Sequence, residues 1–348
     1  MINRRVLSAL RVVLGLGLLW YVLVKTDARH ALIPFLQASW VLPALLLGVL
    51  FGAGVEAVRL RVLFRAAGLR LSLSGAYRVV MIGSFFNFCI PGGTGGDVVK
   101  LYYIASGNRN RGIEVATVLL MDRVLALLAL LTLVLVLAGF NANVVRTEPV
   151  LLSLVATAAG VLCTVLLVMG AVGSRRVRAS RLYAAVLNRL PMRGYMERAA
   201  DAAHAFRDRK LVLLAAGGVS LVGHIGAAIM LAVIGSLVVP SVASGLTALL
   251  SLMGMVANAL PVTPGGLGVG EAAFDQLFRV VGASGAAAIL IGWRMALIPF
   301  AAAGALMYMA GAGKRLAAPD ESRQPGVDVL TGPVDLRDPD IAGMRLER

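Results

Sequence analysis

Two glycine-rich stretches, half a chain apart, carry the residues best suited to binding chemistry. Residues 87–97 and residues 258–271 each contain an asparagine, then Pro-Gly-Gly-x-Gly, and then a carboxylate. Glycines allow a tight turn and let a ligand approach the backbone amides. A helix that begins after such a turn offers unpaired N–H groups and a positive dipole end, which suit an anion such as phosphate. The pattern indicates a hinge or an anion-binding loop, and its repetition favours binding.

The side chains of the two stretches extend this binding hypothesis. Thr94 and Thr263 add hydroxyl groups near the two tips, and Asn87 and Asn258 could tie each stretch to its neighbour. The candidate substrate-binding residues, with the two arginines discussed next, are Asn87, Pro91, Gly92, Gly93, Thr94, Gly95, Asp97, Arg123, Asn258, Thr263, Pro264, Gly265, Gly266, Gly268, Glu271 and Arg294.

Arg123 and Arg294 occupy matching positions in apolar segments that follow the two stretches. Ionisable residues inside a membrane are costly and usually face a cavity or a partner. We therefore expect these arginines either to hold a substrate phosphate or to form structural salt bridges with Asp97 and Glu271. The sequence leaves both alternatives open.

Other polar residues in apolar surroundings have more ordinary explanations. Glu56 and Arg59, three positions apart, can pair on one helix face near a helix end. Lys100 could contact a headgroup phosphate or extend its ammonium to the interface. We expect His224 to be a hydrogen-bonded packing residue, with a proton relay as the alternative.

The sequence gives no support for nucleotide binding, metal binding or catalysis. The glycine-rich stretches lack the third glycine of the dinucleotide fingerprint, and no G-x-x-x-x-G-K-[ST] occurs. The two cysteines, Cys89 and Cys163, have no metal-ligand spacing, so we expect no metal site. No serine or cysteine has a local base signature, and we expect neither a catalytic residue nor a cofactor.

The composition places the chain in a membrane. Hydrophobic residues make up 59% of the 348 residues and charged residues 15%, with a mean hydropathy of +0.86. Typical soluble domains have about 45–50% apolar and about 25% charged residues. The net charge of +15 is typical of basic cytoplasmic loops that meet anionic lipid, and we expect no nucleic-acid partner.

The elements that position the site follow from the apolar runs. Two interrupted segments, at about 79–105 and 243–280, each hold two short elements around a Pro-Gly-Gly break, and we expect two re-entrant helical hairpins. Six other runs are long enough for full transmembrane helices. They lie at about 6–24, 40–58, 114–140, 149–172, 211–238 and 286–312. The sequence thus predicts an all-α polytopic membrane protein.

The basic residues predict the topology. Lys and Arg are concentrated at the N-terminus, in a 59–78 loop, in a 173–210 loop and at Lys314-Arg315. Such residues accumulate on the cytoplasmic side, so both termini should be cytoplasmic and the protein should lie in the cell (inner) membrane.

The same topology predicts an inverted repeat. Each half, 1–142 and 143–312, then contains a span, a span, a hairpin and a span. Three crossings per half invert the second half, as in many secondary transporters, where broken helices form the site. Residues 1–312 would form one transmembrane domain, and the proline-containing residues 313–348 a disordered cytoplasmic tail.

With both motifs identified, the chain resembles the lysylphosphatidylglycerol synthase/flippase transmembrane-domain family over about residues 5–312. The resemblance is carried by residues 87–97, by Asp122-Arg123 and by residues 261–271, of which the last is the most specific. The first motif is looser, because many relatives have a charged residue at the position of Gly93 or Thr94.

The resemblance implies translocation of lipids between leaflets. Relatives that also synthesise aminoacyl-phosphatidylglycerol carry a soluble aminoacyltransferase domain after the membrane part. This chain has a short tail there, so the resemblance implies no synthase activity, and we expect no enzyme.

The leading hypothesis is a flippase-like transporter for a polar- or anionic-headed lipid, whether phospholipid, isoprenoid-linked or hopanoid-type. The headgroup would bind between the two glycine-rich tips while the apolar chains stay in the bilayer. Without an ATP motif, an ion gradient, the membrane potential or a lipid gradient must drive transport. Two alternatives stay open: a non-transporting scaffold that docks a lipid-modifying enzyme through the 173–210 loop, and a membrane-embedded lipid glycosyl- or acyltransferase.

Overall fold

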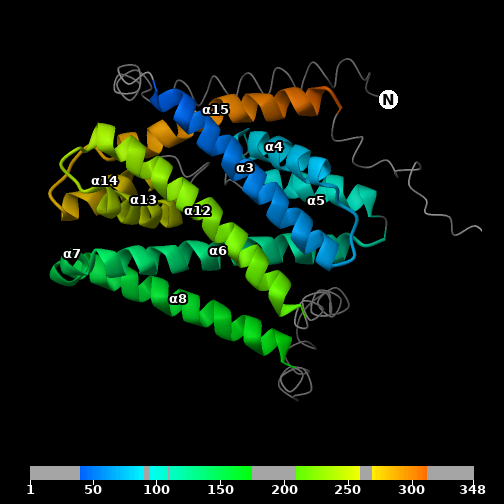
Figure 1. The fold of residues 1–348 in the computed structure, drawn as a ribbon, viewed down its shortest axis with the longest axis horizontal. Coiled ribbons are helices and arrows are strands. Elements are labelled where there is room, and N and C mark those ends of the chain that lie inside the picture. The colour runs from blue at the N-terminus through cyan, green and yellow to red at the C-terminus, as the bar shows by residue number, and fades with distance from the viewer. Residues whose placement is uncertain (1–39, 90–94, 109, 175–208, 259–268, 312–348) are drawn as a thin grey trace, which may run out of the picture. The chain divides into compact units, whose positions relative to one another are not determined.

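The computed structural model describes residues 40–89, 95–108, 110–174, 209–258 and 269–311, which all lie in one compact unit, Met1–Ala317. These residues fold into helices, without a strand among them (Figure 1). The helices are α3 (Val41–Ala66), α4 (Leu73–Cys89), α5 (Gly95–Gly107), α6 (Gly112–Phe140), α7 (Ala142–Thr147), α8 (Pro149–Gly173), α12 (Lys210–Val238), α13 (Ser244–Asn258), α14 (Val269–Val280) and α15 (Ala287–Met309).

Five of these helices, α3, α6, α8, α12 and α15, are long and apolar enough to cross a membrane. They confirm the prediction of an all-helical, multi-pass membrane protein. The span predicted at about 6–24 lies outside the described residues, so the sixth span stays a prediction. The tail at 313–348 and nearly all of the basic 173–210 loop also lie outside them.

Helix α3 is longer than the sequence predicted. It continues to Ala66, so the arginines between 59 and 65 lie on the helix, and their assignment to a loop was wrong. Its end is set by Gly68, whose φ of 67° is readily adopted only by glycine. Charge does not end a helix where a partner neutralises it, and Arg59 has such a partner in Asp122.

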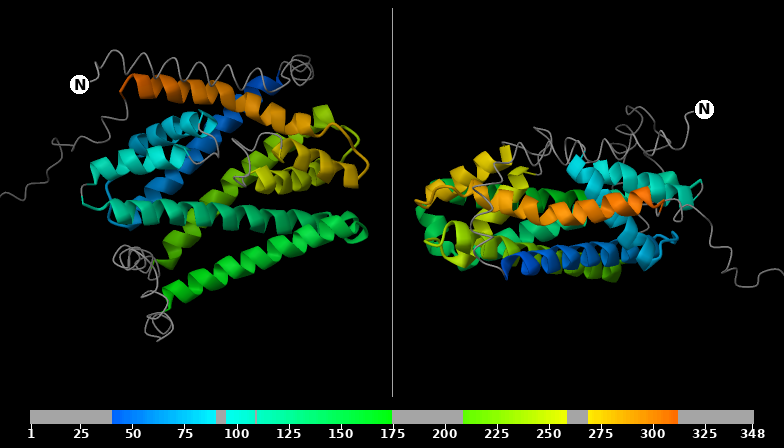
Figure 2. Two further views of the ribbon diagram at one scale, coloured as in Figure 1. Left: turned by 180° about the vertical axis from the view of Figure 1, so that it is seen from behind. Right: turned by 90° about the horizontal axis from the view of Figure 1, so that it is seen from above.

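Each predicted interrupted segment contains two short helices that pack against each other. Helices α4 and α5 have 17 and 13 residues, and α13 and α14 have 15 and 12. The helices of each pair lie side by side (Figure 2). A helix needs about 20 residues to span the hydrocarbon core. These helices therefore stand apart from the five long ones.

The packing of the helices follows a matched pattern. Helices α3, α4, α5 and α6 correspond in order to α12, α13, α14 and α15, and exchanging the two sets preserves the main contacts among these eight helices. For example, α4 packs on α15 while α13 packs on α6, and α3 packs on α12. Among the described helices, α7 and α8 have no counterpart in this exchange and pack on α6 and on each other.

The central pair, α3 and α12, runs antiparallel (Figure 1). Gly48 lies against Met230, Val55 lies against Gly223, and contact partners therefore fall in number on α12 as they rise on α3. Two corresponding helices of the matched sets thus point in opposite directions.

Candidate functional site

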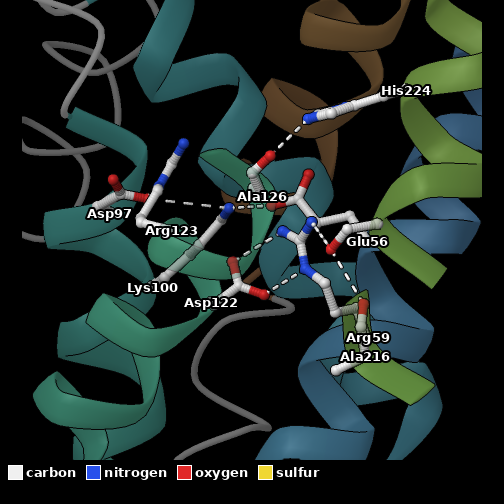
Figure 3. Close-up of polar contacts among 10 residues, drawn as sticks. Glu56, Arg59, Asp97, Lys100, Asp122, Arg123, Ala126, Ala216 and His224 are labelled. Atoms are coloured by element: carbon white, nitrogen blue, oxygen red, sulfur yellow. Dashed lines mark hydrogen bonds and ion pairs between the residues drawn. The ribbon is translucent and has the colours of Figure 1, made fainter. Parts of the chain in front are cut away.

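Six charged side chains from three helices of the first set form one cluster beside α12 (Figure 3). Three are carboxylates and three are cations, so their formal charges cancel. They are Glu56 and Arg59 from α3, Asp97 and Lys100 from α5, and Asp122 and Arg123 from α6.

Lys100 is the buried centre of this cluster, with a side chain only 4% exposed. Its ammonium donates a hydrogen bond to Oε1 of Glu56 and lies 4.0 Å from Oδ1 of Asp97. Neither sequence expectation for Lys100 was right, because the side chain points inward rather than to the headgroups. The nearby carboxylate of Glu56 offsets part of the free-energy cost of burying the ammonium group.

Arg59 forms the second buried link. Its Nε and Nη2 donate to both carboxylate oxygens of Asp122, at 2.5 and 2.8 Å, and its Nη1 donates to Oγ of Ser220 at 3.0 Å. This bidentate geometry is the strongest arrangement for such a pair. The expected pairing of Glu56 with Arg59 was wrong, because each residue finds its partner on another helix. Arg59 thereby joins α3, α6 and α12.

Arg123 is the outward-facing cation of the cluster. Its Nη2 donates to Oδ1 of Asp97, yet half of its side chain, 50%, stays exposed. Its neighbours on the same helix face, Leu120 and Leu127, are exposed apolar side chains, as are Val98 and Tyr102 beside Asp97 on α5. The ion pair therefore lies within an apolar outer surface formed by α5 and α6, which pack together.

The start of α5 is tied to the end of α4. Oδ1 of Asn87 accepts a hydrogen bond from the backbone N–H of Gly96 at 2.8 Å. A Cβ on Gly96 would lie 2.3 Å from the carbonyl oxygen of Gly83, so glycine is required for this close approach. Because Asn87 occupies one terminal amide and Asp97 places a negative charge in the first turn, this helix end offers an anion less than the sequence predicted.

The second set repeats the ion pair in a more buried form. Arg294 of α15 donates through Nη1 to Glu271, in the first turn of α14, and through Nη2 to Oδ1 of Asn258 at 3.0 Å. Its side chain is 9% exposed. A Cβ on Gly270 would lie 2.3 Å from Oδ1 of Asn258, which again brings the two half-helices close together.

The two arginines thus lie in different environments. Arg123 is half exposed on an apolar outer face, whereas Arg294 is enclosed and bonded to two side chains. The structure brings each arginine to the carboxylate that the sequence paired with it. It also distinguishes a half-exposed arginine, Arg123, from an enclosed one, Arg294, that bonds a side chain of each short helix of its set.

The tips of both stretches lie outside the described residues. This applies to nine of the candidate residues: Pro91, Gly92, Gly93, Thr94, Thr263, Pro264, Gly265, Gly266 and Gly268. Of the other seven, Gly95 is the buried first residue of α5, and the remaining six form the contacts given above.

His224 of α12 is hydrogen-bonded to the backbone of α6. Nε2 of His224 lies 2.8 Å from the carbonyl oxygen of Ala126 and donates to it, a contact that packs α12 on α6. Within the described part of the chain, no group of three or more His, Cys, Asp or Glu side chains is arranged to hold a metal ion.

Sequence reasoning missed the contact between Glu56 and Lys100. These residues lie 44 positions apart on helices of different segments. The available signal was that each is a charged residue within an otherwise apolar run, where charges usually find partners. The spacing does not say which partner, because helix packing decides that.

One comparison with known proteins identifies the chain as a membrane region. A family model described as the lysylphosphatidylglycerol synthase TM region matches residues 8–304. No curated protein and no solved structure matches the chain.

Proposed function

The chain belongs to the lysylphosphatidylglycerol synthase TM-region family, and on this premise we propose that it moves polar- or anionic-headed lipids between membrane leaflets. In this proposal the lipid phosphate binds at Arg123, while the apolar chains stay in the bilayer. Arg294, Glu271 and Asn258 position the corresponding half-helix of the second set. The chain acts as a transporter rather than as an enzyme.

The observation that carries this proposal is the exposure of the Arg123–Asp97 pair amid exposed apolar side chains. Arginine is well suited to phosphate because its planar guanidinium offers paired donors. The adjoining side chains of Leu120, Leu127 and Val98 suit acyl or isoprenoid chains. A headgroup can thus reach the arginine from the bilayer while its chains remain in contact with apolar surface.

The matched packing supports an inverted repeat with two re-entrant hairpins. Corresponding helices α3 and α12 are antiparallel, and the short pairs α4–α5 and α13–α14 take equivalent places. Hairpins that enter from opposite faces would bring the two glycine-rich tips together near the middle of the membrane. Rocking of one half against the other would then expose the site alternately to each leaflet.

Exchange in liposomes tests the function. Liposomes containing the full chain and a lipid labelled on its acyl chain are treated with a membrane-impermeant quencher, which reports the fraction in the outer leaflet. We expect exchange faster than in protein-free liposomes for at least one phosphate-bearing lipid. Exchange no faster than in protein-free liposomes, across phospholipid and isoprenoid-phosphate probes, would reject transport.

Replacing Arg123 tests the site. A hydrogen bond to a charged group is worth about 1.5–3 kcal/mol, so Arg123→Ala should slow exchange by about tenfold to a hundredfold. Arg123→Lys should recover part of the rate. Arg146→Ala, at an exposed arginine in the last turn of α7, is the matched control and should exchange at the wild-type rate. Equal rates for Arg123→Ala and the control, in protein that elutes as wild type on gel filtration, would make the Arg123–Asp97 pair purely structural.

A further inference from the structure

We propose that one proton travels with each anionic lipid headgroup, held between Glu56 and Asp97 beside Lys100. The inference rests on the lipid translocation proposed above and adds the coupling ion to it. It follows from the way in which one buried ammonium lies between two carboxylates (Figure 3).

The resting cluster is balanced because each carboxylate has its own cation. Glu56 takes Lys100, Asp122 takes Arg59, and Asp97 takes Arg123. Asp97 also lies 4.0 Å from Lys100, so it has a second cation within reach of a small movement. The outermost of the three pairs is the Asp97–Arg123 pair.

A phosphate that binds Arg123 competes directly with Asp97 for the guanidinium. Asp97 then loses its partner and has Lys100 as its nearest cation. Two partly exposed carboxylates, Glu56 and Asp97, would then share the one buried ammonium of Lys100. The cluster and a monoanionic headgroup together would carry one net negative charge, which is unfavourable in a membrane interior.

Binding of one proton removes this excess charge. When two carboxylates must share one ammonium, one negative charge is left without a counter-charge, and that favours protonation of one carboxylate. The proton would be taken from water on the side where the headgroup enters and released on the side where it leaves. One monoanionic lipid and one proton then cross together, and no net charge moves.

The other charged groups near Glu56 are not placed to take up the proton, which we therefore assign to Glu56 and Asp97. Arg59 on the same helix and Asp122 on α6 are committed to each other, and His224 on α12 donates to the carbonyl of Ala126. Arg294 on α15 pairs with Glu271 instead. On α4, Arg78 makes no hydrogen bond or ion pair with the cluster among the described residues.

The second set lacks such a shared cation in its matching place. Lys100 lies against Gly83 of α4, and the side chain that lies against the corresponding Gly254 of α13 is Phe274. Proton uptake is therefore assigned to the first set alone.

The leaflet distribution of acyl-labelled phosphatidylglycerol tests the coupling. In liposomes with the full-length protein and an imposed difference of one pH unit, one-to-one coupling predicts about a tenfold enrichment in the leaflet facing the more alkaline side. A potassium diffusion potential set with valinomycin should leave the distribution unchanged. A distribution that follows the potential and ignores the pH difference would overturn the coupling.

Charge-removing variants localise the proton. Glu56→Gln still accepts a hydrogen bond from Lys100, and it should exchange lipid while the enrichment falls from about tenfold to about even. Asp97→Asn serves as the second variant; because it removes the partner of Arg123 its exchange rate is expected to change, and the readout is the leaflet ratio at equilibrium, which should fall to about even. Glu114→Gln, at the surface pair with Arg111, should keep the tenfold ratio. Full enrichment in both Glu56→Gln and Asp97→Asn would overturn the assignment.

The two proposals fail in different ways. Exchange in the wild type without any pH-driven enrichment would overturn the coupling and leave the transport function standing. Absence of exchange would overturn the function and the coupling with it.

Discussion

At the scale of single residues, two consecutive positions of α6 take opposite roles. Asp122 is buried and bonded to Arg59, whereas Arg123 is half exposed and bonded to Asp97. With 3.6 residues per turn, neighbours on a helix point about 100° apart, so one faces the core and the other the outer surface. The two charges therefore lie in different environments, and in the proposed mechanism Asp122 serves stability while Arg123 serves binding.

The Arg59–Asp122 pair provides a prediction for stability. Asp122→Ala leaves the buried guanidinium of Arg59 without its counter-charge, and breaking such a pair costs about 3–5 kcal/mol. We expect a clearly lower thermal unfolding temperature in detergent. The double variant Arg59→Met with Asp122→Ala removes both charges and should recover much of the loss. If the double variant instead lost still more of its unfolding temperature, as independent effects that add would do, the two charges would not stabilise the fold as a pair.

At the scale of elements, the half-helices meet through glycine. Gly96 and Gly270 each lie where a Cβ would come within 2.3 Å of an oxygen of the preceding half-helix. Each preceding half-helix carries an asparagine in its last turn, Asn87 in α4 and Asn258 at the end of α13, and a carboxylate follows the glycine directly. The glycine thus fixes how closely the two short helices approach, and this approach places the carboxylate against its arginine.

Gly96→Ala tests this close approach. The new methyl group would meet the backbone oxygen of Gly83, which cannot rotate away, and overpacking of this kind costs about 1–3 kcal/mol. We expect reduced thermal stability and slower lipid exchange together. Gly217→Ala is the matched control, because nothing lies within 4 Å of the added Cβ on α12. In a helix, alanine is more favourable than glycine by up to about 1 kcal/mol, so the control should be neutral or stabilising. If Gly96→Ala and Gly217→Ala had the same thermal stability and exchange rate, the contact between α4 and α5 would tolerate the added methyl group.

At the scale of the whole described unit, the matched packing of α3–α6 and α12–α15 relates the two halves of the site. The antiparallel course of α3 and α12 agrees with the inverted repeat that the distribution of arginines predicts. The halves are not chemically equivalent, since the first holds the charged cluster and the second encloses its single arginine. In the proposed mechanism, the first half binds the lipid headgroup and the coupled proton, and the second half forms the opposite side of the site.

Cysteine labelling tests the inverted arrangement. In a background with Cys89 and Cys163 replaced by serine, single cysteines are placed at Trp40, Lys210 and Ser241, which are exposed at helix ends. Because α3 and α12 are antiparallel, an impermeant maleimide should label Trp40→Cys and Ser241→Cys from one side and Lys210→Cys from the other. Labelling of Trp40→Cys and Lys210→Cys from the same side would contradict the inverted repeat.

The sequence by itself determined the membrane class, the five described long helices and the two interrupted pairs, because hydrophobic run length and Gly/Pro breaks are local properties. It also offered the pairing of Asp97 with Arg123 and of Glu271 with Arg294 as one of two alternatives, because the residues of each pair have a similar spacing in the two halves of the chain. Only the tertiary structure joined Glu56 to Lys100 and Arg59 to Asp122. Those contacts depend on how α3, α5 and α6 are rotated and packed, and the formation of each buried pair depends on which charge another helix brings within reach.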